Sequence, residues 1–128
     1  MKKLLTSLLV AGALAAGSTS FAADTAPKSV IHVITVAFNA DATPAQIQAA
    51  LDGAHKLPSQ FKGITRVWTK AIKVQNLSEA KVKKTHVIVM EFASEQALKD
   101  YADSPAQKEW YKLYEGVRQQ STTYDITN

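Results

Sequence analysis

Four short stretches of the chain are rich in β-branched and aromatic residues and place side chains alternately on two sides, a pattern typical of β-strands. Between them, apolar residues recur at the spacing of amphipathic helices. The resulting order, β-α-β-β-α-α-β, predicts an α+β domain with a ferredoxin-like split βαβ fold, in which helices cover one face of a four-stranded antiparallel sheet. The predicted strands are residues 30–38, 64–72, 85–92 and 121–127.

Each predicted helix begins with a capping signal. In TPAQ at residues 43–46, the threonine can cap free backbone N–H groups, the proline suits the first helical position and the glutamine can complete a capping box. Leu57 and Pro58 predict the end of this helix. Ser94 and Ser104 begin the other two. The predicted apolar stripes are Ala97, Leu98, Tyr101 and Ala102 for the second helix, and Ala106, Trp110, Leu113 and Val117 for the third.

Both faces of the predicted sheet are apolar. In the first strand, Ile34 and Val36 share one face with His32, while Ile31 and Val33 line the other. The third strand repeats this pattern. Helices on one side cover only one face, and an antiparallel sheet with a solvated face alternates apolar with polar residues. We therefore predict a homodimer in which a second subunit packs against the uncovered face.

The first 22 residues have the pattern of a bacterial secretory signal peptide. Lys2 and Lys3 precede an apolar run, and SFA at residues 20–22 fits the small-x-small rule for signal peptidase. The apolar run is shorter than the ~20 residues of a membrane-spanning helix. We expect cleavage after Ala22, a periplasmic or secreted protein without a membrane span, a flexible lead-in at residues 23–29 and one domain at residues 30–128.

The amino-acid composition excludes several classes of catalytic and binding chemistry. The chain has no cysteine, so thiol catalysis and disulfides are excluded. Its formal charge is +4, but two lysines belong to the predicted signal peptide and the others are scattered, so we expect no nucleic-acid partner. A Gly-rich phosphate loop, a serine nucleophile motif and a metal-ligand spacing are all missing from the sequence, and we expect no cofactor and no metal.

Several segments together resemble the stress-responsive A/B barrel domain family, whose members are dimeric α/β barrels. They are IHVITVAF, a helix ending in KLP, THVIVMEF, SEQALKDY and SPAQKEW, in this order over residues 30–127. The resemblance implies a homodimer in which two four-stranded sheets form a barrel, with a pocket in each subunit between its own sheet and helices. By the family's name alone, it also implies a role in stress response.

The resemblance also implies candidate site residues. A plant member that cyclises polyketides uses a first-strand histidine, a tyrosine and a His-Pro-x-His helix start. The first two positions fall on His32 and Tyr101 here, and the helix start falls on SPAQ at residues 104–107, so both of its histidines are absent. A third-strand histidine common in relatives falls on His86.

Judged from residue type and position alone, each of these candidate site residues fits more than one role. Ser104 and Gln107 can form a capping box, and glutamine cannot exchange a proton near neutral pH, so catalysis by the family's histidine pair is not expected. His32 and His86 fit either core histidines or a proton-transferring, ligand-orienting pair. Tyr101 fits a core position or a pocket hydroxyl. Trp68, between Arg66 and Lys70 on alternate positions, fits a ligand site or the dimer contact.

Three functions follow from these residues. The first is an exported dimer that binds a small, partly apolar molecule through His32, His86, Tyr101, Gln107 and Trp68. The second is a cofactor-free enzyme of lyase, cyclase or monooxygenase type, with His32 as general base and Tyr101 as donor to a developing oxyanion. The third is a structural or partner-binding dimer without a ligand. The missing histidines of the helix start favour binding over catalysis.

Overall fold

The computed structural model describes residues 17, 26–76, 78 and 82–127. Apart from Gly17, the predicted signal peptide lies outside these described residues, as do residues 23–25 of the predicted lead-in. The elements of the domain are β1 (Val30–Phe38), α1 (Pro44–Gln60), β2 (Ile64–Ala71), β3 (His86–Phe92), α2 (Glu95–Tyr101), α3 (Pro105–Tyr114) and β4 (Arg118–Ile126).

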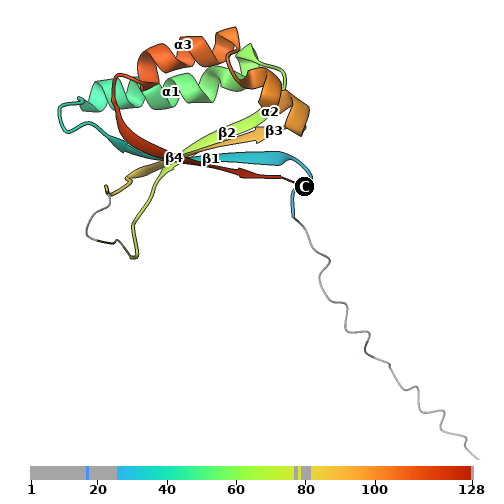
Figure 1. The fold of residues 1–128 in the computed structure, drawn as a ribbon, viewed down its shortest axis with the longest axis horizontal. Coiled ribbons are helices and arrows are strands. Elements are labelled where there is room, and N and C mark those ends of the chain that lie inside the picture. Colours follow the sequence, from blue (N-terminus) through green and yellow to red (C-terminus); the bar gives the residue numbers. More distant parts are fainter. Residues whose placement is uncertain (1–16, 18–25, 77, 79–81, 128) are drawn as a thin grey trace, which may run out of the picture.

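The strands form one antiparallel sheet in the order β2-β3-β1-β4, and the helices lie together on one of its faces (Figure 1). This is the ferredoxin-like arrangement predicted from the sequence, in which the two βαβ units interleave their strands. β4 is consequently an edge strand beside β1. Within the described part of the chain, no helix has the length and apolar character needed to cross a bilayer.

The hydrophobic core lies between the sheet and the helices. Ile34 of β1 is paired with Ile88 of β3, and both side chains are buried against the helices. From α1, Ala50 and Leu57 pack onto this layer. The indole Nε1 of Trp110 on α3 donates a hydrogen bond of 2.9 Å to the carbonyl oxygen of Ala50, which ties α3 to α1.

The start of α1 is as predicted, and its end is not. The Thr43 hydroxyl accepts from the Gln46 backbone N–H at 3.2 Å, and the Gln46 side-chain oxygen accepts from the Thr43 N–H at 2.9 Å. The prediction that the helix ends at Leu57 and Pro58 is wrong, because α1 continues through Pro58 to Gln60. Pro58 removes one backbone donor, but Leu57 is fully buried and its carbonyl accepts from Phe61 at 2.9 Å. Packing and this closing bond keep the last turn helical.

The apolar stripe of α3 differs by one residue from the prediction. Ala106 and Trp110 are buried as expected, but Leu113 is 45% exposed and Tyr114 is buried in its place. The spacing of four residues puts the rings of Trp110 and Tyr114 on one side of the helix, where they stack with centroids 4.4 Å apart. Val117, beyond the helix, is buried too.

β4 starts three residues before the predicted position, at Arg118. Its first residues are RQQ, which lack the apolar alternation by which a strand is recognised. The pairing of β4 with β1 has one register shift, between Ala37 and Phe38, and is regular from there to Ile126. This regular part places alternate β4 side chains on the helix-facing side of the sheet.

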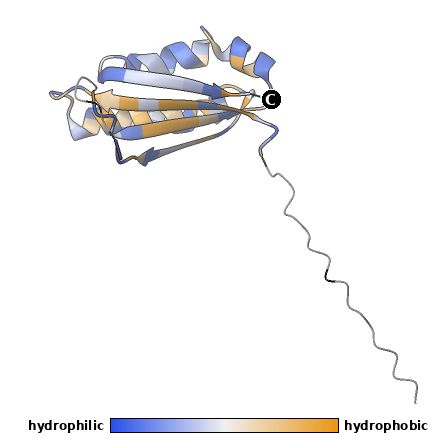
Figure 2. Cartoon of the chain, turned by 60° about the horizontal axis from the view of Figure 1, so that its bottom comes forward, coloured by the Kyte–Doolittle hydropathy of each residue, from blue (hydrophilic) through white to orange (hydrophobic). Residues whose placement is uncertain are grey.

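The opposite face of the sheet is largely apolar, as predicted, although Arg66, Lys70 and Glu91 also lie on it, and no helix of the described part of the chain covers it (Figure 1). Figure 2 shows hydrophobic residues along the strands of this face. At the edge, Tyr124 and Ile126 of β4 are 60% and 59% exposed. The apolar residues on this face are Ile31, Val33, Ala37, Trp68, Val87, Val89, Tyr124 and Ile126.

Candidate functional site

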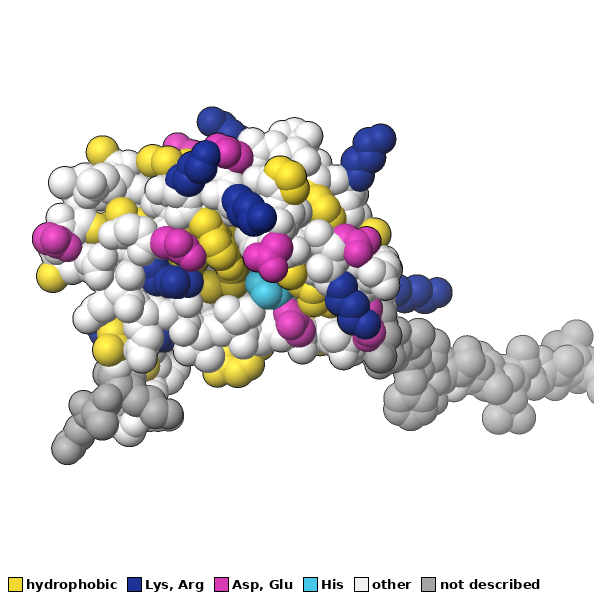
Figure 3. Space-filling view, turned by 45° about the horizontal axis from the view of Figure 1, so that its top comes forward, with side chains coloured by type: hydrophobic (Ala, Val, Ile, Leu, Met, Phe, Trp, Pro, Cys, Tyr) yellow, Lys and Arg dark blue, Asp and Glu magenta, His cyan; other side chains and the backbone are white. Residues whose placement is uncertain are grey.

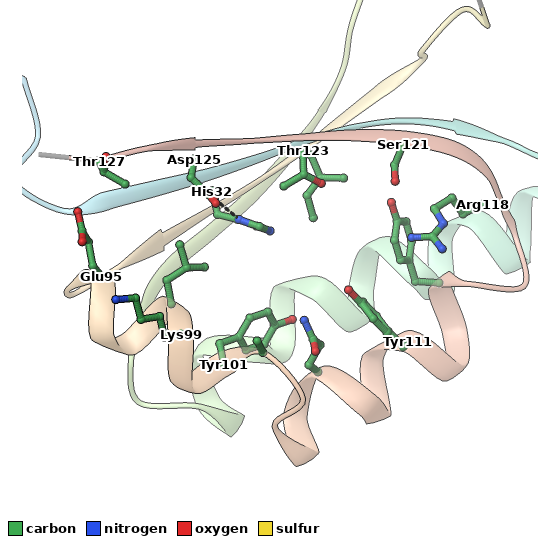
Figure 4. A pocket seen from close by; sticks show the side chains of 15 residues that line it. His32, Glu95, Lys99, Tyr101, Tyr111, Arg118, Ser121, Thr123, Asp125 and Thr127 are labelled. Carbon is green, nitrogen blue, oxygen red and sulfur yellow. Dashed lines mark hydrogen bonds and ion pairs between the residues drawn. The ribbon is translucent and has the colours of Figure 1, made fainter.

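A cavity of about 460 Å³ lies between the β1–β4 edge of the sheet and the helices α2 and α3. Figure 3 shows acidic and basic side chains around a histidine and exposed hydrophobic side chains on this side of the molecule. In Figure 4 the two strands form one wall, and α2, α3 and the segment between them form the other. The volume lies in the range of ~300–1,000 Å³ that is usual for small-molecule sites.

β4 gives the cavity its polar wall. Because strand residues alternate in direction, the helix-facing residues of β4 follow one another at every second position. The side chains that line the cavity from this part of the chain are Ser121, Thr123, Asp125 and Thr127. The neighbouring strand contributes His32 and the apolar Ile34. The cavity therefore combines polar groups from one edge strand with an apolar interior.

Among the described residues of this wall, His32 and Asp125 are the only two titratable groups in contact. They are directly opposite each other in β1 and β4, and His32 Nδ1 lies 2.5 Å from Asp125 Oδ1. The His32 side chain is 17% exposed, and its ring packs edge-on against Phe92 with centroids 6.0 Å apart. When Nδ1–H of the neutral ring donates to the carboxylate, the second ring nitrogen is an acceptor. Figure 4 shows the rest of this ring pointing into the cavity.

Tyr101, at the end of α2, brings a buried hydroxyl to the cavity wall. The residue is 2% exposed, and its ring packs against Phe61 and Phe92. Its hydroxyl is buried and has no hydrogen-bond partner among the described residues. Burial, with a smaller contribution from Tyr111, raises the pKa of Tyr101 well above its usual value. The hydroxyl is therefore a neutral donor that lines the cavity and lacks an acceptor.

The segment between α2 and α3 fixes Gln107. Asp103 has a positive φ of 62°, which turns the chain sharply between the helices. Ser104 caps α3 by accepting from the Gln107 N–H at 3.2 Å, as predicted. The other half of the predicted capping box differs, because the Gln107 side-chain oxygen accepts from Asp103 N–H at 2.7 Å and not from Ser104. With its oxygen engaged in this way, Gln107 presents its NH₂ group as the remaining donor of the amide.

A second polar group lies at the start of β4. The guanidinium carbon of Arg118 lies 5.3 Å from the centroid of the Tyr114 ring. Arg118, Tyr111 and Tyr114 all line the cavity with Ser121. Burial raises the pKa values of Tyr111 and Tyr114, and the nearby charge of Arg118 offsets part of this rise in both. The Tyr114 hydroxyl, like that of Tyr101, is buried and has no hydrogen-bond partner among the described residues.

The structure brings three of the five predicted ligand-binding residues to the cavity, namely His32, Tyr101 and Gln107. His86 does not reach it. His86 is paired with Val36, four residues along β1 from His32, which corresponds to about 13 Å. Its ring packs against Phe38 with centroids 5.3 Å apart, and its Nδ1 is 2.9 Å from the Thr85 hydroxyl. His32 and His86 therefore share a sheet face but not a pocket.

Trp68 lies on the other side of the sheet from the cavity. The register pairs it with Val89, whose side chain belongs to the uncovered face. A bulge between Ile64 and Arg66 precedes this pairing and determines which side the indole takes. Of the two sequence interpretations of Trp68, its position agrees with the dimer contact and not with the pocket.

Sequence patterns did not identify Asp125, Arg118, Tyr111 or Tyr114 as site residues. The polar alternation of residues 121–127 was a usable signal, because an edge strand with threonine, serine and aspartate on its inner side implies a polar wall. The partnership of His32 with Asp125 depends on strand register across 93 residues, which no local pattern specifies.

The polar side chains of the cavity suit an organic ligand better than a metal ion. No cluster of three or more histidine, aspartate or glutamate side chains that could hold a metal ion occurs among the described residues. The cavity groups with fixed roles are the hydroxyl of Tyr101, the amide of Gln107 and the imidazole of His32. Together they can hydrogen-bond to a carbonyl or hydroxyl group, and His32 can accept a proton from it.

The fold and this pocket define a ferredoxin-like α+β protein with a cavity between the sheet and the second and third helices. The model of the family described as Stress Responsive A/B Barrel Domain matches residues 30–128. The chain belongs to this family, which confirms the resemblance inferred from its segments. No functionally curated protein matches the chain.

Solved structures support the fold. At3g17210 from Arabidopsis thaliana matches with a TM-score of 0.68 and 21% identity, over 77% of this chain and 94% of that protein. A dimeric ferredoxin-like protein from Thermobifida fusca matches with a TM-score of 0.62 and 15% identity, over 78% and 91%. The hydroxynitrile lyase of Passiflora edulis matches with a TM-score of 0.64 and 15% identity, over 80% and 96%. At these identities the likeness concerns the fold.

Proposed function

We propose that this protein is a homodimer that binds a small, partly apolar molecule in the cavity beside His32 and Tyr101. The observation that carries the proposal is the Tyr101 hydroxyl, which is buried on the cavity wall without a partner among the described residues. A buried hydroxyl without a hydrogen bond costs about 1–3 kcal/mol. A ligand acceptor at this point would remove that cost, so the site favours occupancy.

The pair His32–Asp125 supports a ligand with a polar group. The carboxylate holds one side of the imidazole, and the ring extends from β1 into the cavity (Figure 4). A fixed ring of this kind can accept a hydrogen bond from a ligand hydroxyl or donate one to a carbonyl when protonated. Apolar contact with the remainder of the ligand is available from Ile34 and Leu98.

The uncovered sheet face supports the dimer. Aromatic and aliphatic residues lie together on this face, and Tyr124 and Ile126 are largely exposed in the single subunit. Exposed apolar patches of this kind mark association surfaces. The T. fusca protein with the same fold is described as dimeric, which agrees with this arrangement.

A second candidate function is a cofactor-free enzyme of lyase, cyclase or monooxygenase type, which the His32–Asp125 pair favours. In this case His32 accepts a proton from the substrate as general base. Tyr101 and the Gln107 NH₂ group donate to the oxygen on which negative charge develops. The fold also occurs in the Passiflora edulis hydroxynitrile lyase. A pH-dependent turnover that disappears in His32→Ala would establish this function.

Export and a role in stress response belong to the same proposal. Export rests on the pattern of residues 1–22, and the stress role rests on the family to which the chain belongs. The mass of the protein recovered from the periplasm or medium tests the first, with cleavage after Ala22 as the expected result. Expression of the protein under envelope stress tests the second.

The decisive experiment is a native mass spectrum of the full chain expressed with its own N-terminus and purified from the compartment to which it is delivered. We expect a dimer that carries a reproducible additional mass. His32→Ala and Tyr101→Phe should remain dimers and lose that mass. His86→Gln is the matched control, because it changes a histidine on the same sheet face outside the cavity, and it should retain the mass. Retention in both cavity variants would contradict the proposed site.

A further inference from the structure

The charges around the cavity are divided unequally between its ends. Glu95, Lys99 and Asp125 lie toward one end, and Arg118 lies at the other (Figure 4). Asp125 is already engaged by His32. No carboxylate forms an ion pair with Arg118 within the described part of the chain, so its guanidinium is a cavity charge that lacks a counterion there.

The position of Arg118 is fixed by buried aromatic packing. Its guanidinium lies over the ring of Tyr114, and that ring is stacked at 4.4 Å on Trp110. Trp110 is in turn held by its hydrogen bond to Ala50. Arg118 also begins β4, where it is paired with Phe38. The cation is therefore presented to the cavity by rigid neighbours on two sides.

The groups that line the cavity beside Arg118 are neutral donors, and the nearby carboxylates of Glu115 and Asp103, whose charges act on Tyr111, lie outside this lining. Ser121, Tyr111 and Tyr114 line the same end, and Figure 4 shows the hydroxyl of Tyr111 directed toward the cavity. Burial keeps the pKa values of both tyrosines raised, so they carry protons at neutral pH. Arginine has donors only. This end offers several hydrogen-bond donors and one positive charge, which is the complement of a carboxylate.

Between this end and the histidine the cavity lining is mainly apolar, with Thr123 of β4 as a polar side chain between Ser121 and Asp125. Ile34, Leu98 and Ala102 line the cavity together with the Tyr101 ring. Ser121 and Asp125 are four positions apart in β4, which corresponds to about 13 Å of strand. A ligand that reaches both ends is consequently elongated and largely apolar between two polar groups.

We propose that the ligand of this cavity is an elongated, mainly apolar carboxylic acid, whose carboxylate binds at Arg118, Ser121 and Tyr111. Its far end carries a hydroxyl or carbonyl group that hydrogen-bonds to His32 and Tyr101. The inference rests on the proposed function, because it names the ligand class for the same cavity.

Three related compounds test the two ends separately. The first is 4-(4-hydroxyphenyl)butanoate, which has a carboxylate and a distal hydroxyl. The second, 4-(4-hydroxyphenyl)butanamide, replaces only the carboxylate by a neutral amide. The third, 4-phenylbutanoate, lacks only the distal hydroxyl. Binding of each to the full-length dimer is measured by isothermal titration calorimetry, at constant ionic strength because ion pairing depends on salt.

Arg118→Gln is the main variant, and Lys99→Gln is the matched control, since it removes a positive charge from the opposite end. We expect the first compound to bind at least about tenfold more tightly than its amide, as a charge-assisted contact is worth about 1.5–3 kcal/mol. Arg118→Gln should abolish this difference, and Lys99→Gln should leave it within about twofold. Arg118→Lys, which keeps the charge without the planar fork, should retain part of it.

The outcomes distinguish this inference from the proposed function. Equal binding of the acid and the amide to the natural protein overturns the carboxylate assignment, and so does an unchanged preference in folded Arg118→Gln. Failure of all three compounds to bind overturns the ligand class. The proposed function is judged independently by the mass that co-purifies with the protein and by its loss in His32→Ala. Weaker binding of the third compound, with no further loss in Tyr101→Phe, supports the placement of the distal group.

Discussion

His32 and Asp125 face each other across β1 and β4, and the imidazole Nδ1 lies 2.5 Å from the carboxylate Oδ1. This contact joins the two strands that form the polar wall of the cavity. It also selects the tautomer of the neutral ring, because a carboxylate accepts only from a protonated Nδ1. The other nitrogen is left to interact with whatever occupies the cavity.

Asp125→Asn should move the proton on the neutral imidazole. An asparagine amide can donate to Nδ1, so the proton then lies on Nε2 and the group that faces the cavity becomes a donor. Long-range ¹H–¹⁵N correlation spectra of the His32 ring report this directly. Ligand affinity should fall by about tenfold. Asp100→Asn on α2, whose partner is Gln96, is the control. A proton already on Nε2 in the natural protein would contradict the assignment.

Tyr101→Phe should raise the free energy of unfolding at neutral pH by about 1 kcal/mol in the ligand-free protein. The substitution removes a buried hydroxyl that has no partner in the described structure and keeps the ring contacts with Phe61 and Phe92. Urea unfolding followed by circular dichroism measures the change. The same variant should bind the ligand more weakly. Lower stability of the variant would mean that the hydroxyl is satisfied in the free protein.

Stability should fall in alkaline solution in a way that depends on Tyr101. Burial raises the pKa of Tyr101, so the folded chain keeps this proton above about pH 10, where the unfolded chain loses it. The contribution is complete below about pH 10 and declines above it, by at most about 1.4 kcal/mol per pH unit for each such tyrosine. In urea unfolding at several pH values, Tyr101→Phe should show a shallower decline. Identical slopes would contradict the assignment.

Tyr124→Glu should convert the dimer to a monomer without unfolding the subunit. Tyr124 is 60% exposed in the single subunit, so a charge there costs little until a second sheet covers it. Leu113→Glu is the control, since Leu113 is also a large, partly exposed apolar residue but lies on the helical side. Light scattering at micromolar concentration gives both masses. A monomeric natural protein would contradict the predicted dimer.

Asp103→Gly should be more stable than Asp103→Ala by about 1 kcal/mol. Asp103 has a φ of 62°, a conformation that costs a side-chain-bearing residue about 1–2 kcal/mol and glycine almost nothing. Both substitutions remove the carboxyl group, so the difference in their stability reports the conformational energy of the backbone at this position. Thermal unfolding of the two variants measures it. Equal stability would mean that the turn relaxes to a negative φ.

The sequence specified the fold well, because its signals are local. The capping box at Thr43 and Gln46 and the alternating strands each depend on neighbours a few residues apart. The errors also have local causes. Pro58 is a helix breaker by rule, but burial of Leu57 outweighs the loss of one hydrogen bond. The start of β4 at Arg118 carries no apolar pattern, and pairing with β1 alone defines it.

Only part of the candidate site could be predicted from the sequence. His32 and Tyr101 were found through resemblance to the family, and both line the cavity. His86 and Trp68 were grouped with them because residue type does not reveal distance along a strand or, after a bulge, the face of the sheet. Asp125 was missed because its role depends on the residue opposite it in another strand.

The edge strand β4 belongs to two surfaces at once. Asp125 projects into the cavity, and its immediate neighbours Tyr124 and Ile126 project from the opposite side of the same backbone. Any shift of β4 that accommodates the proposed ligand would therefore also alter the face of the proposed dimer contact. Occupancy and self-association are then thermodynamically linked, and each changes the equilibrium constant of the other by the same factor. The dissociation constant of the proposed dimer would then be a measure of what the cavity contains.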